Sequence, residues 1–440
     1  MPETVASPAS IASASIDGRA LYRRITWRLI PYLFLLYIAA YIDRVNVGFA
    51  AMDMKRQLAF SDTVYGTGAA IFFLGYAGFD LPSNLLMRRV GTRLWIARIM
   101  ITWGIVAALM IFVRSPRSFY TMRFLLGVAE AGFVPGMLLY LTYWFPSHER
   151  ARAVAKFMTA TSLAGVVGGP LSSTLLKLDG VRGLQGWQWL FVVEGITTVL
   201  LGISVLFILK DGPDKADWLQ PEEKLWLATE LDRDHAIYGA TKHHAFGDAF
   251  RMPTLWFLAA VYVTIQVGVY IVNLWMPLML SSLGAGAHDA SLIARYSTVP
   301  YLLAAIFTVI IGSSSDRTNE RRGHLAGCMV LAAIGFAWAA MAQSVFIALF
   351  AFTLAAIGLW STMGPFWAMM TRTVSGTAAA AGVAMITTLG GLGGFAGPYL
   401  TGILKDATHS FARGLYAVSL LALGAALLSL AVRQREAIAA

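Results

Sequence analysis

The sequence predicts an all-α protein that crosses a membrane many times. Three observations lead to this fold class: 58% of the 440 residues are hydrophobic, only 13% are charged, and the mean hydropathy is +0.65. Soluble globular proteins do not combine so many apolar residues with so few charges. The apolar residues also gather in runs of roughly 20, which is the length of a helix that spans a bilayer.

The apolar runs form two groups of six, separated by one long polar connection. This pattern predicts an N-terminal tail (1–28), a six-helix bundle (29–209), a linker (210–253), a second six-helix bundle (254–432) and a C-terminal tail (433–440). The N-terminal tail is polar and has no signal-peptide pattern, so we expect it to be disordered. The twelve predicted segments are 29–51, 63–87, 94–113, 119–144, 153–176, 187–209, 254–280, 291–313, 324–342, 345–370, 378–404 and 411–432.

The positive charges predict the orientation of these segments. The termini and the even-numbered loops together carry about twice as many Lys and Arg residues as the odd-numbered loops. Positively charged loops favour the cytoplasmic side, so both termini are predicted to be cytoplasmic. The net charge of +10 therefore reflects topology, and no nucleic-acid partner is expected. A single cysteine, Cys328, excludes an intramolecular disulfide and a Cys-based metal cluster.

The linker contains one helix signal. Pro221 is followed by Glu222 and Glu223, a favourable helix start, and predicts a short amphipathic helix over about 221–234. The remainder of the linker carries His243 and His244. Two histidines could bind a metal ion, but a solvated pair is the simpler interpretation.

A weak internal repeat supports the two-bundle division. Residues 84–93 and 312–322 each place a charged residue four positions after a small one, with a basic cluster beyond. Repeats related by an axis along the membrane normal occur in transporters. Arg89, Asp316 and Arg317 in these loops, and Asp80 just before the first, are candidate gating residues.

The first predicted segment contains Asp43 and Arg44 with apolar residues on both sides. Charged residues at such a position cost roughly 2.5–3.5 kcal/mol each on insertion scales and are usually functional. The alternative is a pair near a helix end that reaches to the interface. We therefore expect these two residues to face the protein interior and to form part of a functional site.

Segments two, four and six add further polar groups. Arg123 and Glu130 are seven residues apart on segment four, about 10.5 Å along one helix face, with Gly127 between them. They could bind substrate and proton, or merely complete a buried polar network. Tyr76 lies on segment two as a possible substrate contact, although membrane tyrosines often only pack. Glu194 is a lone acid on segment six.

The second half is expected to supply hydrogen bonds and aromatic walls. Its segments seven, ten and eleven have no charge between their ends. The glycines of segment eleven permit close helix contact and bending. The candidate substrate-binding residues here are Asn273, Trp275, Trp360, Ser361 and Thr387.

No motif for covalent chemistry or nucleotide binding is present in the sequence. There is no HExxH, no Gly-x-Ser-x-Gly, no Walker A loop and no CxxC pair. An enzyme is therefore not expected, and transport would depend on an ion gradient.

Several longer motifs resemble the anion:cation symporter family of the major facilitator superfamily, and in particular its bacterial tartrate-type and carboxylate permeases. The resemblance covers nearly the full chain and implies a major facilitator fold, proton-coupled uptake of small organic anions, and proton-carrying roles for Asp43 and Glu130. It implies substrate or charge-pair roles for Arg44, Tyr76 and Arg123. The motifs lie at 42–50, 82–85, 123–133, 143–146, 178–180 and 186–191.

One departure from the family concerns segment eleven. Many relatives have Ile-Asn-x-x-Gly-Asn there, whereas this chain has Thr387 and Gly391 at the two asparagine positions. In some members an asparagine contacts a sugar-acid hydroxyl, so this difference argues against a heavily hydroxylated substrate.

The sequence thus leads to one hypothesis and three alternatives. The hypothesis is a monomeric, proton-coupled importer of a small carboxylate in the bacterial inner membrane, with lipid around it and no cofactor besides the proton. The alternatives are an exporter on the same fold, a non-transporting membrane sensor and a membrane-embedded enzyme.

Overall fold

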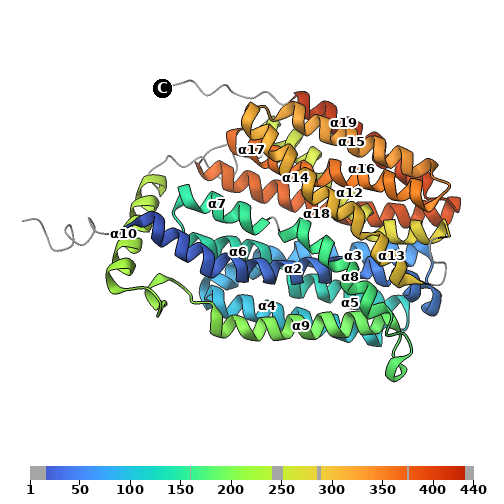
Figure 1. The fold of residues 1–440 in the computed structure, drawn as a ribbon, viewed down its shortest axis with the longest axis horizontal. Coiled ribbons are helices and arrows are strands. Elements are labelled where there is room, and N and C mark those ends of the chain that lie inside the picture. The colour runs from blue at the N-terminus through green and yellow to red at the C-terminus, as the bar shows by residue number, and fades with distance from the viewer. Residues whose placement is uncertain (1–15, 159, 240–250, 285–288, 374–375, 432–440) are drawn as a thin grey trace, which may run out of the picture.

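The computed structural model describes residues 16–158, 160–239, 251–284, 289–373 and 376–431, and in these residues every regular element is a helix (Figure 1). Eleven spans within them are long and apolar enough to cross a membrane. The α-helices are α2 (Gly18–Leu58), α3 (Asp62–Val90), α4 (Thr92–Ala108), α5 (Pro116–Glu130), α6 (Phe133–Thr142), α7 (Ser147–Met158), α8 (Ala160–Leu176), α9 (Gly186–Ile208), α10 (Pro221–Gly239), α12 (Pro253–Ser282), α13 (Ala290–Tyr296), α14 (Thr298–Thr318), α15 (Arg322–Met341), α16 (Val345–Ser361), α17 (Met363–Thr373), α18 (Gly376–Thr408) and α19 (Ala412–Ala431).

The helices confirm the predicted all-α membrane fold. Several predicted segments are broken into two helices, for example segment four into α5 and α6. The predicted segment 153–176 corresponds to α7 and α8, which are separated by residue 159, outside the described residues. Together with this pair, the eleven spans account for the twelve predicted segments.

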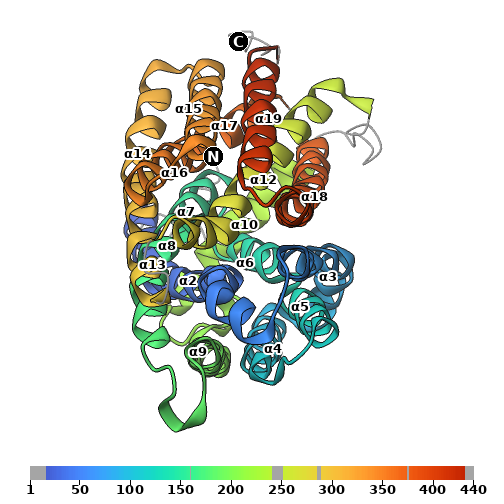
Figure 2. The ribbon, with the colours of Figure 1, turned by 90° about the vertical axis from the view of Figure 1, so that its right-hand side faces the viewer.

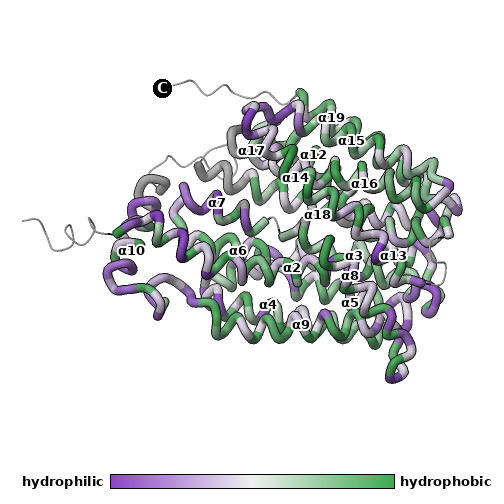
Figure 3. The backbone as a smooth tube through the Cα atoms, viewed as in Figure 1, coloured by the Kyte–Doolittle hydropathy of each residue, from purple (hydrophilic) through white to green (hydrophobic). Residues whose placement is uncertain are grey.

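The chain forms two helical groups that lie side by side. Figure 2 shows α2 to α9 in one group and α12 to α19 in the other. Apolar residues run along the helices and hydrophilic residues gather at their ends (Figure 3), as expected for a bilayer-spanning bundle. We call the two groups the first and the second bundle.

The linker helix α10 begins at Pro221, which confirms the predicted start, and extends beyond the predicted end at 234. It is attached to the first bundle. Trp226 packs against Tyr22, with ring centroids 5.7 Å apart, and the Asp234 carboxylate accepts a hydrogen bond from the Ser147 backbone N–H at 3.1 Å. The histidines 243 and 244 lie outside the described residues.

The two ends of the molecule differ in how the bundles meet. We call the end that carries α10 the linker face, and the opposite end, which carries the turns at 59–61 and 409–411, the far face (Figure 1). Hydrogen bonds from Asp406 to α3, from Tyr65 to Leu274 and from Ser281 to Met52 join the two bundles toward the far face, and the bond between Asn273 and Tyr41 joins them at mid-depth. The bundles are therefore sealed at the far face.

Close backbone contacts build this seal. A Cβ atom at Gly66 of α3 would collide with the Pro398 carbonyl oxygen of α18, so only glycine permits the observed approach. Next to it, the Tyr65 hydroxyl donates to the Leu274 carbonyl oxygen at 2.9 Å, and the Trp275 ring packs edge-on against Tyr65.

Candidate functional site

Arg44 and Glu130 form an ion pair between α2 and α5. The Arg44 Nη2 donates to Glu130 Oε1, and Glu130 is almost completely buried. The Arg44 side chain keeps 13% of its surface exposed, so it is the accessible member of the pair. Its guanidinium also lies 5.2 Å from the Tyr76 ring centroid and 5.7 Å from that of Phe72. A buried charge without an opposite charge beside it is energetically costly, so Arg44 and Glu130 stabilise each other.

A break in the fourth transmembrane segment places Glu130 at a helix end. Helix α5 ends at Glu130, and α6 begins at Phe133 after Gly132, whose φ of +86° favours glycine. The Asp80 carboxylate accepts the Gly132 backbone N–H at 3.0 Å, and Ser83 Oγ donates to the Ala131 carbonyl oxygen at 2.7 Å. Asp80, a predicted gating residue, therefore stabilises the break that positions Glu130.

Gly127 allows α3 and α5 to pack closely beside the ion pair. A Cβ atom at this position would collide with the Phe72 carbonyl oxygen of α3. Gly127 thus makes room for the backbone of a neighbouring helix.

Arg123 lies on the same face of α5 as Glu130, as its spacing predicted, but makes different contacts. Its Nε donates to the Gly68 carbonyl oxygen at 3.3 Å, and its guanidinium lies 5.0 Å from the Phe72 ring centroid. Its Nη1 is buried and has no hydrogen-bond partner among the described residues. Arg123 is therefore a second buried cation near Glu130, with capacity for one more acceptor.

Asp43 points away from Arg44, toward α9. Its Oδ2 accepts a hydrogen bond from Thr198 Oγ1 at 2.7 Å. One turn further along α2, Asn46 Nδ2 donates to Glu194 Oε2 at 2.9 Å. The two adjacent charges Asp43 and Arg44 thus belong to different clusters, and Glu194, the single acid of α9, has a hydrogen-bond partner on α2.

In the second bundle, Asn273 is at the centre of a polar chain. Its Nδ2 donates to the Tyr41 hydroxyl of the first bundle at 3.1 Å, and its Oδ1 accepts from the Tyr301 hydroxyl at 2.7 Å. Trp360 packs edge-on against Tyr301, with centroids 5.6 Å apart. The neighbouring Ser361 is buried, and its hydroxyl has no partner within the described part of the chain. Of these groups, Asn273 and Tyr301 lie at the contact between the bundles.

Two predicted substrate residues lie elsewhere. Trp275 is buried in the far-face seal, where it contacts Tyr65 and Phe411. Because Asn273 and Trp275 are two residues apart, they point to different sides of α12. Thr387 is exposed, and its hydroxyl donates to carbonyl oxygens of its own helix. The structure does not bring these two side chains to Arg44.

The remaining predicted gating residues lie at the ends of α3 and α14. Arg89 and Arg317 are exposed. Asp316 forms an ion pair with Arg321 at 2.6 Å, directly before the short turn that leads into α15. Their gating role stays a prediction.

The structure also brings three tyrosines near Arg44 that the sequence analysis did not select. Tyr37, Tyr262 and Tyr270 all lie within electrostatic reach of the guanidinium. The signal was present as spacing: 37, 41 and 44 share one face of α2, and 262, 266, 270 and 273 share one face of α12. With Tyr76, they give the surroundings of Arg44 aromatic faces and hydroxyl groups.

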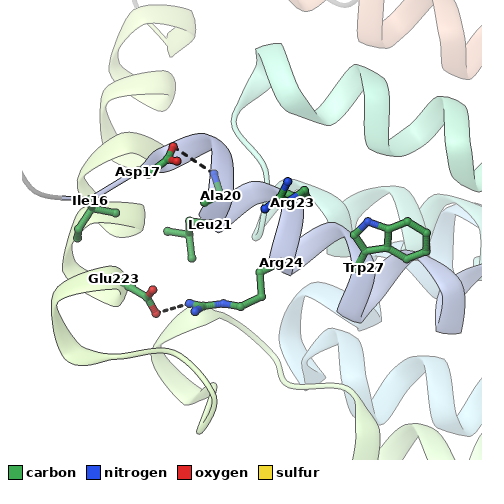
Figure 4. A pocket seen from close by; sticks show the side chains of 8 residues that line it. All are labelled: Ile16, Asp17, Ala20, Leu21, Arg23, Arg24, Trp27 and Glu223. Carbon is green, nitrogen blue, oxygen red and sulfur yellow. Dashed lines mark hydrogen bonds and ion pairs between the residues drawn. The ribbon is translucent and has the colours of Figure 1, made fainter.

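This arrangement can hold a small anion. A guanidinium binds a carboxylate through two parallel N–H donors, and aromatic faces and hydroxyls can orient the rest of the molecule. A different pocket, of about 480 Å³, lies at the linker face between the start of α2 and α10 (Figure 4). There Arg24 reaches Glu223, so this pocket belongs to the linker attachment.

Comparisons with known proteins give concordant results. The sequence profile described as Major Facilitator Superfamily matches residues 33–398. The chain is 46% identical over 420 residues to an Agrobacterium vitis protein named "Putative tartrate transporter", covering 96% of this chain and 92% of that one. It is also 40% identical over 401 residues to an Acinetobacter baumannii "Quinolone resistance transporter", covering 91% and 92%.

Solved structures show the same fold. A bacterial homologue of the human lysosomal transporter Spinster superposes with a TM-score of 0.76 at 18% identity, covering 93% of this chain and 97% of that one. The xylose transporter XylE from Escherichia coli gives a TM-score of 0.75 at 12% identity, covering 93% and 98%.

Proposed function

Because the chain belongs to the major facilitator superfamily, we propose that it is a proton-coupled symporter that imports a small organic carboxylate across the bacterial cytoplasmic membrane. It is a multi-pass membrane transporter and not an enzyme. Tartrate, aromatic acids and sugar acids are the proposed substrate class, and we propose a monomer surrounded by lipid.

The observation that carries the proposal is the Arg44–Glu130 pair. Arg44 is the partly exposed cation, and its present partner is a buried carboxylate from another helix. A substrate carboxylate has the same chemistry as that partner and can compete for the same donors. Arg123, with an unoccupied buried donor nearby, is placed to assist.

Protonation of Glu130 would link substrate binding to the proton. A neutral Glu130 no longer forms an ion pair with Arg44, so the guanidinium is free to bind a substrate anion. Because an unpaired buried charge is costly, Glu130 should be ionised only while it is paired with Arg44. A monoanion that enters against 100 mV of inside-negative potential is opposed by about 2.3 kcal/mol. One proton carried with it makes the step electrically neutral, and two make the potential a driving force.

The seal at the far face supports alternating access. We propose that the linker face is cytoplasmic, since the positively charged loops and both tails lie on that side of the predicted topology. The structure would then represent a state that is closed to the outside. The substrate would be released toward the cytoplasm when Glu130 loses its proton and forms its ion pair with Arg44 again.

The surroundings of Arg44 indicate what kind of carboxylate fits. Tyr37, Tyr76, Tyr262 and Tyr270 offer ring faces and hydroxyls, which suit an aromatic acid or a short hydroxy acid. Asn273 already uses its amide groups on Tyr41 and Tyr301. A substrate hydroxyl would have to compete with those tyrosines.

Uptake into proteoliposomes tests the proposal. Tartrate, sugar acids, phthalate, hydroxyphenylacetate and nicotinate are offered with and without an inward proton gradient. We expect gradient-stimulated accumulation of at least one of these acids, and loss of the stimulation in Glu130→Gln and Asp43→Asn. Accumulation that ignores the gradient would remove the proton mechanism, and normal coupling in Asp43→Asn would remove that residue's role.

Export is the second candidate function, because one relative is named a quinolone resistance transporter. The buried arginines favour an anion as the transported species. The direction of the coupled proton flux distinguishes the two functions. Outward movement of substrate driven by proton entry would establish export.

A further inference from the structure

A second pair of buried carboxyl groups lies between α2 and α9. Asp43 is 1% exposed and Glu194 is 5% exposed, and the two lie within electrostatic reach of each other. They come from neighbouring helices of the same bundle, so their proximity does not depend on how the two bundles meet. The Arg44–Glu130 pair uses neither of them.

The hydrogen bonds around this pair leave oxygens without donors. Thr198 donates to Asp43 Oδ2 and Asn46 Nδ2 donates to Glu194 Oε2. Three further buried oxygens have no hydrogen-bond partner among the described residues: Asp43 Oδ1, Glu194 Oε1 and the side-chain oxygen of Asn46. Ionised carboxylates are acceptors only, whereas a protonated carboxyl group supplies one O–H donor. The indole N–H of Trp103 on α4 is a donor close to Asp43, so the oxygens that still lack a donor are Glu194 Oε1 and the side-chain oxygen of Asn46. One proton bound by the two acids would provide a donor there.

Among the described residues, no cation is paired with either acid. The charged groups that act on Asp43 and Glu194 are each other and Glu130, and α4 adds the uncharged indole N–H of Trp103, a hydrogen-bond donor to Asp43. Helices α8 and α12 contain no charged residue. Other charged groups on the surrounding helices interact elsewhere or are exposed. Arg44 is paired with Glu130, Arg152 is paired with Glu149, and Arg98 stacks on Trp95. Asp80 accepts from the Gly132 N–H, and Arg295 is exposed. Two like charges so deeply buried cannot both remain ionised.

The charges of the five groups in these two clusters lead to the same result. Arg44 and Arg123 are positive, and Glu130 is negative while it is paired. If Asp43 and Glu194 together hold one proton, their joint charge is minus one and the five groups sum to zero. If both were ionised, an apolar interior would carry an uncompensated negative charge.

From this donor deficit and this charge balance, we propose that Asp43 and Glu194 share one proton and form a second proton-binding site, separate from Glu130. The site keeps the interior neutral while Glu130 is ionised. Its part in transport rests on the proposed function: the substrate anion would then require a second proton, taken up by Glu130, to restore neutrality.

Infrared spectroscopy of the full chain in lipid, without substrate, tests the shared proton directly. The probe is the C=O stretching band of protonated carboxyl groups, identified by its shift in D₂O. We expect a band near neutral pH that disappears or shifts in both Glu194→Gln and Asp43→Asn, because each variant removes half of one site. Asp53→Asn, at a carboxylate paired with Arg56, is the matched control and should leave the band unchanged.

Each other outcome counts against the proposal. An unchanged band in Glu194→Gln would show that Glu194 is ionised, and loss of the band in Asp43→Asn alone would show an unshared proton. If Glu194→Gln does not fold, Glu194→Asp keeps the acid and should retain a shifted band; an unshifted band there would equally refute sharing. The band does not require transport, so gradient-independent uptake with this band present would refute the proposed function and leave the shared proton intact.

Discussion

Asp406 fastens the two bundles together at the far face, and its removal should open that face. The carboxylate, near the end of α18, accepts the backbone N–H groups of Asp62 at 3.1 Å and Thr63 at 2.7 Å. These are the first two residues of α3, whose N–H groups have no partner within the helix. Asp406 thus caps a helix of the other bundle, and α3 also keeps its own cap, Ser61.

The size of the effect follows from this geometry. An N-terminal cap contributes about 0.5–2 kcal/mol, and a negative charge at a helix N-terminus adds about 0.3–1 kcal/mol. Asp406 is only partly buried and Ser61 remains, so we expect Asp406→Ala to cost the sealed state about 1–2 kcal/mol. That corresponds to a factor of roughly 5–30 in the ratio of sealed to open molecules.

Distances between spin labels can measure this ratio. Labels at the exposed far-face positions Arg117 and Gln343 report the separation of the two bundles, after replacement of the buried Cys328. Asp406→Ala should increase the long-distance population by the factor given above. Lys405→Ala is the matched control, since Lys405 donates to the His409 carbonyl oxygen and lies over the Phe411 ring, both in its own bundle. Unchanged populations in a folded Asp406→Ala protein would refute the capping argument.

Three further predictions concern the site and its scaffold. Arg44→Lys should reduce carboxylate uptake more than tenfold, because lysine keeps the charge but loses the two parallel N–H donors of the guanidinium. The control Arg152→Lys, at an exposed arginine, should leave uptake unchanged. Equal effects of the two substitutions would disprove the role of the guanidinium. Gly127→Ala should lower the thermal unfolding temperature, because its Cβ atom would collide with α3, whereas Gly78→Ala has open space and should be neutral or slightly stabilising; the reverse order would contradict the packing. The hydroxyl of Ser291 and two backbone N–H groups lower the pKa of Asp289. The stabilisation by Asp289 is therefore present above its unfolded-state pKa and is lost as the pH falls through its folded-state pKa. Unfolding at two pH values should show that Asp289→Ala reduces the free energy of unfolding by about 0.5–1 kcal/mol at pH 7 and has no effect in strong acid.

The fold was predictable because the hydropathy pattern that specifies membrane helices can be read from residues that are neighbours in sequence. Runs of apolar residues, the polar linker and the start of α10 at Pro221 each depend on neighbours in sequence. The break between α5 and α6 was harder to predict, since it depends on Asp80 from another helix accepting the N–H of Gly132. A Gly-x-x-Pro pattern alone does not show which residue will stabilise the interruption.

The candidate site was predictable in its members but less so in its pairing. The sequence singles out four charged residues because charges are rare within apolar segments: Asp43, Arg44, Arg123 and Glu130. Partners depend on the rotation of each helix, which spacing within one helix does not give. The sequence therefore could not show that Arg44 meets Glu130 while Asp43 faces α9.

The attachment of α10 to the first bundle has a consequence for how the bundles can move. Because Trp226 packs against Tyr22 and Asp234 accepts from Ser147, α10 moves with the first bundle as one body. Loosening α10 should therefore weaken the folded first bundle without favouring either side of the transport cycle.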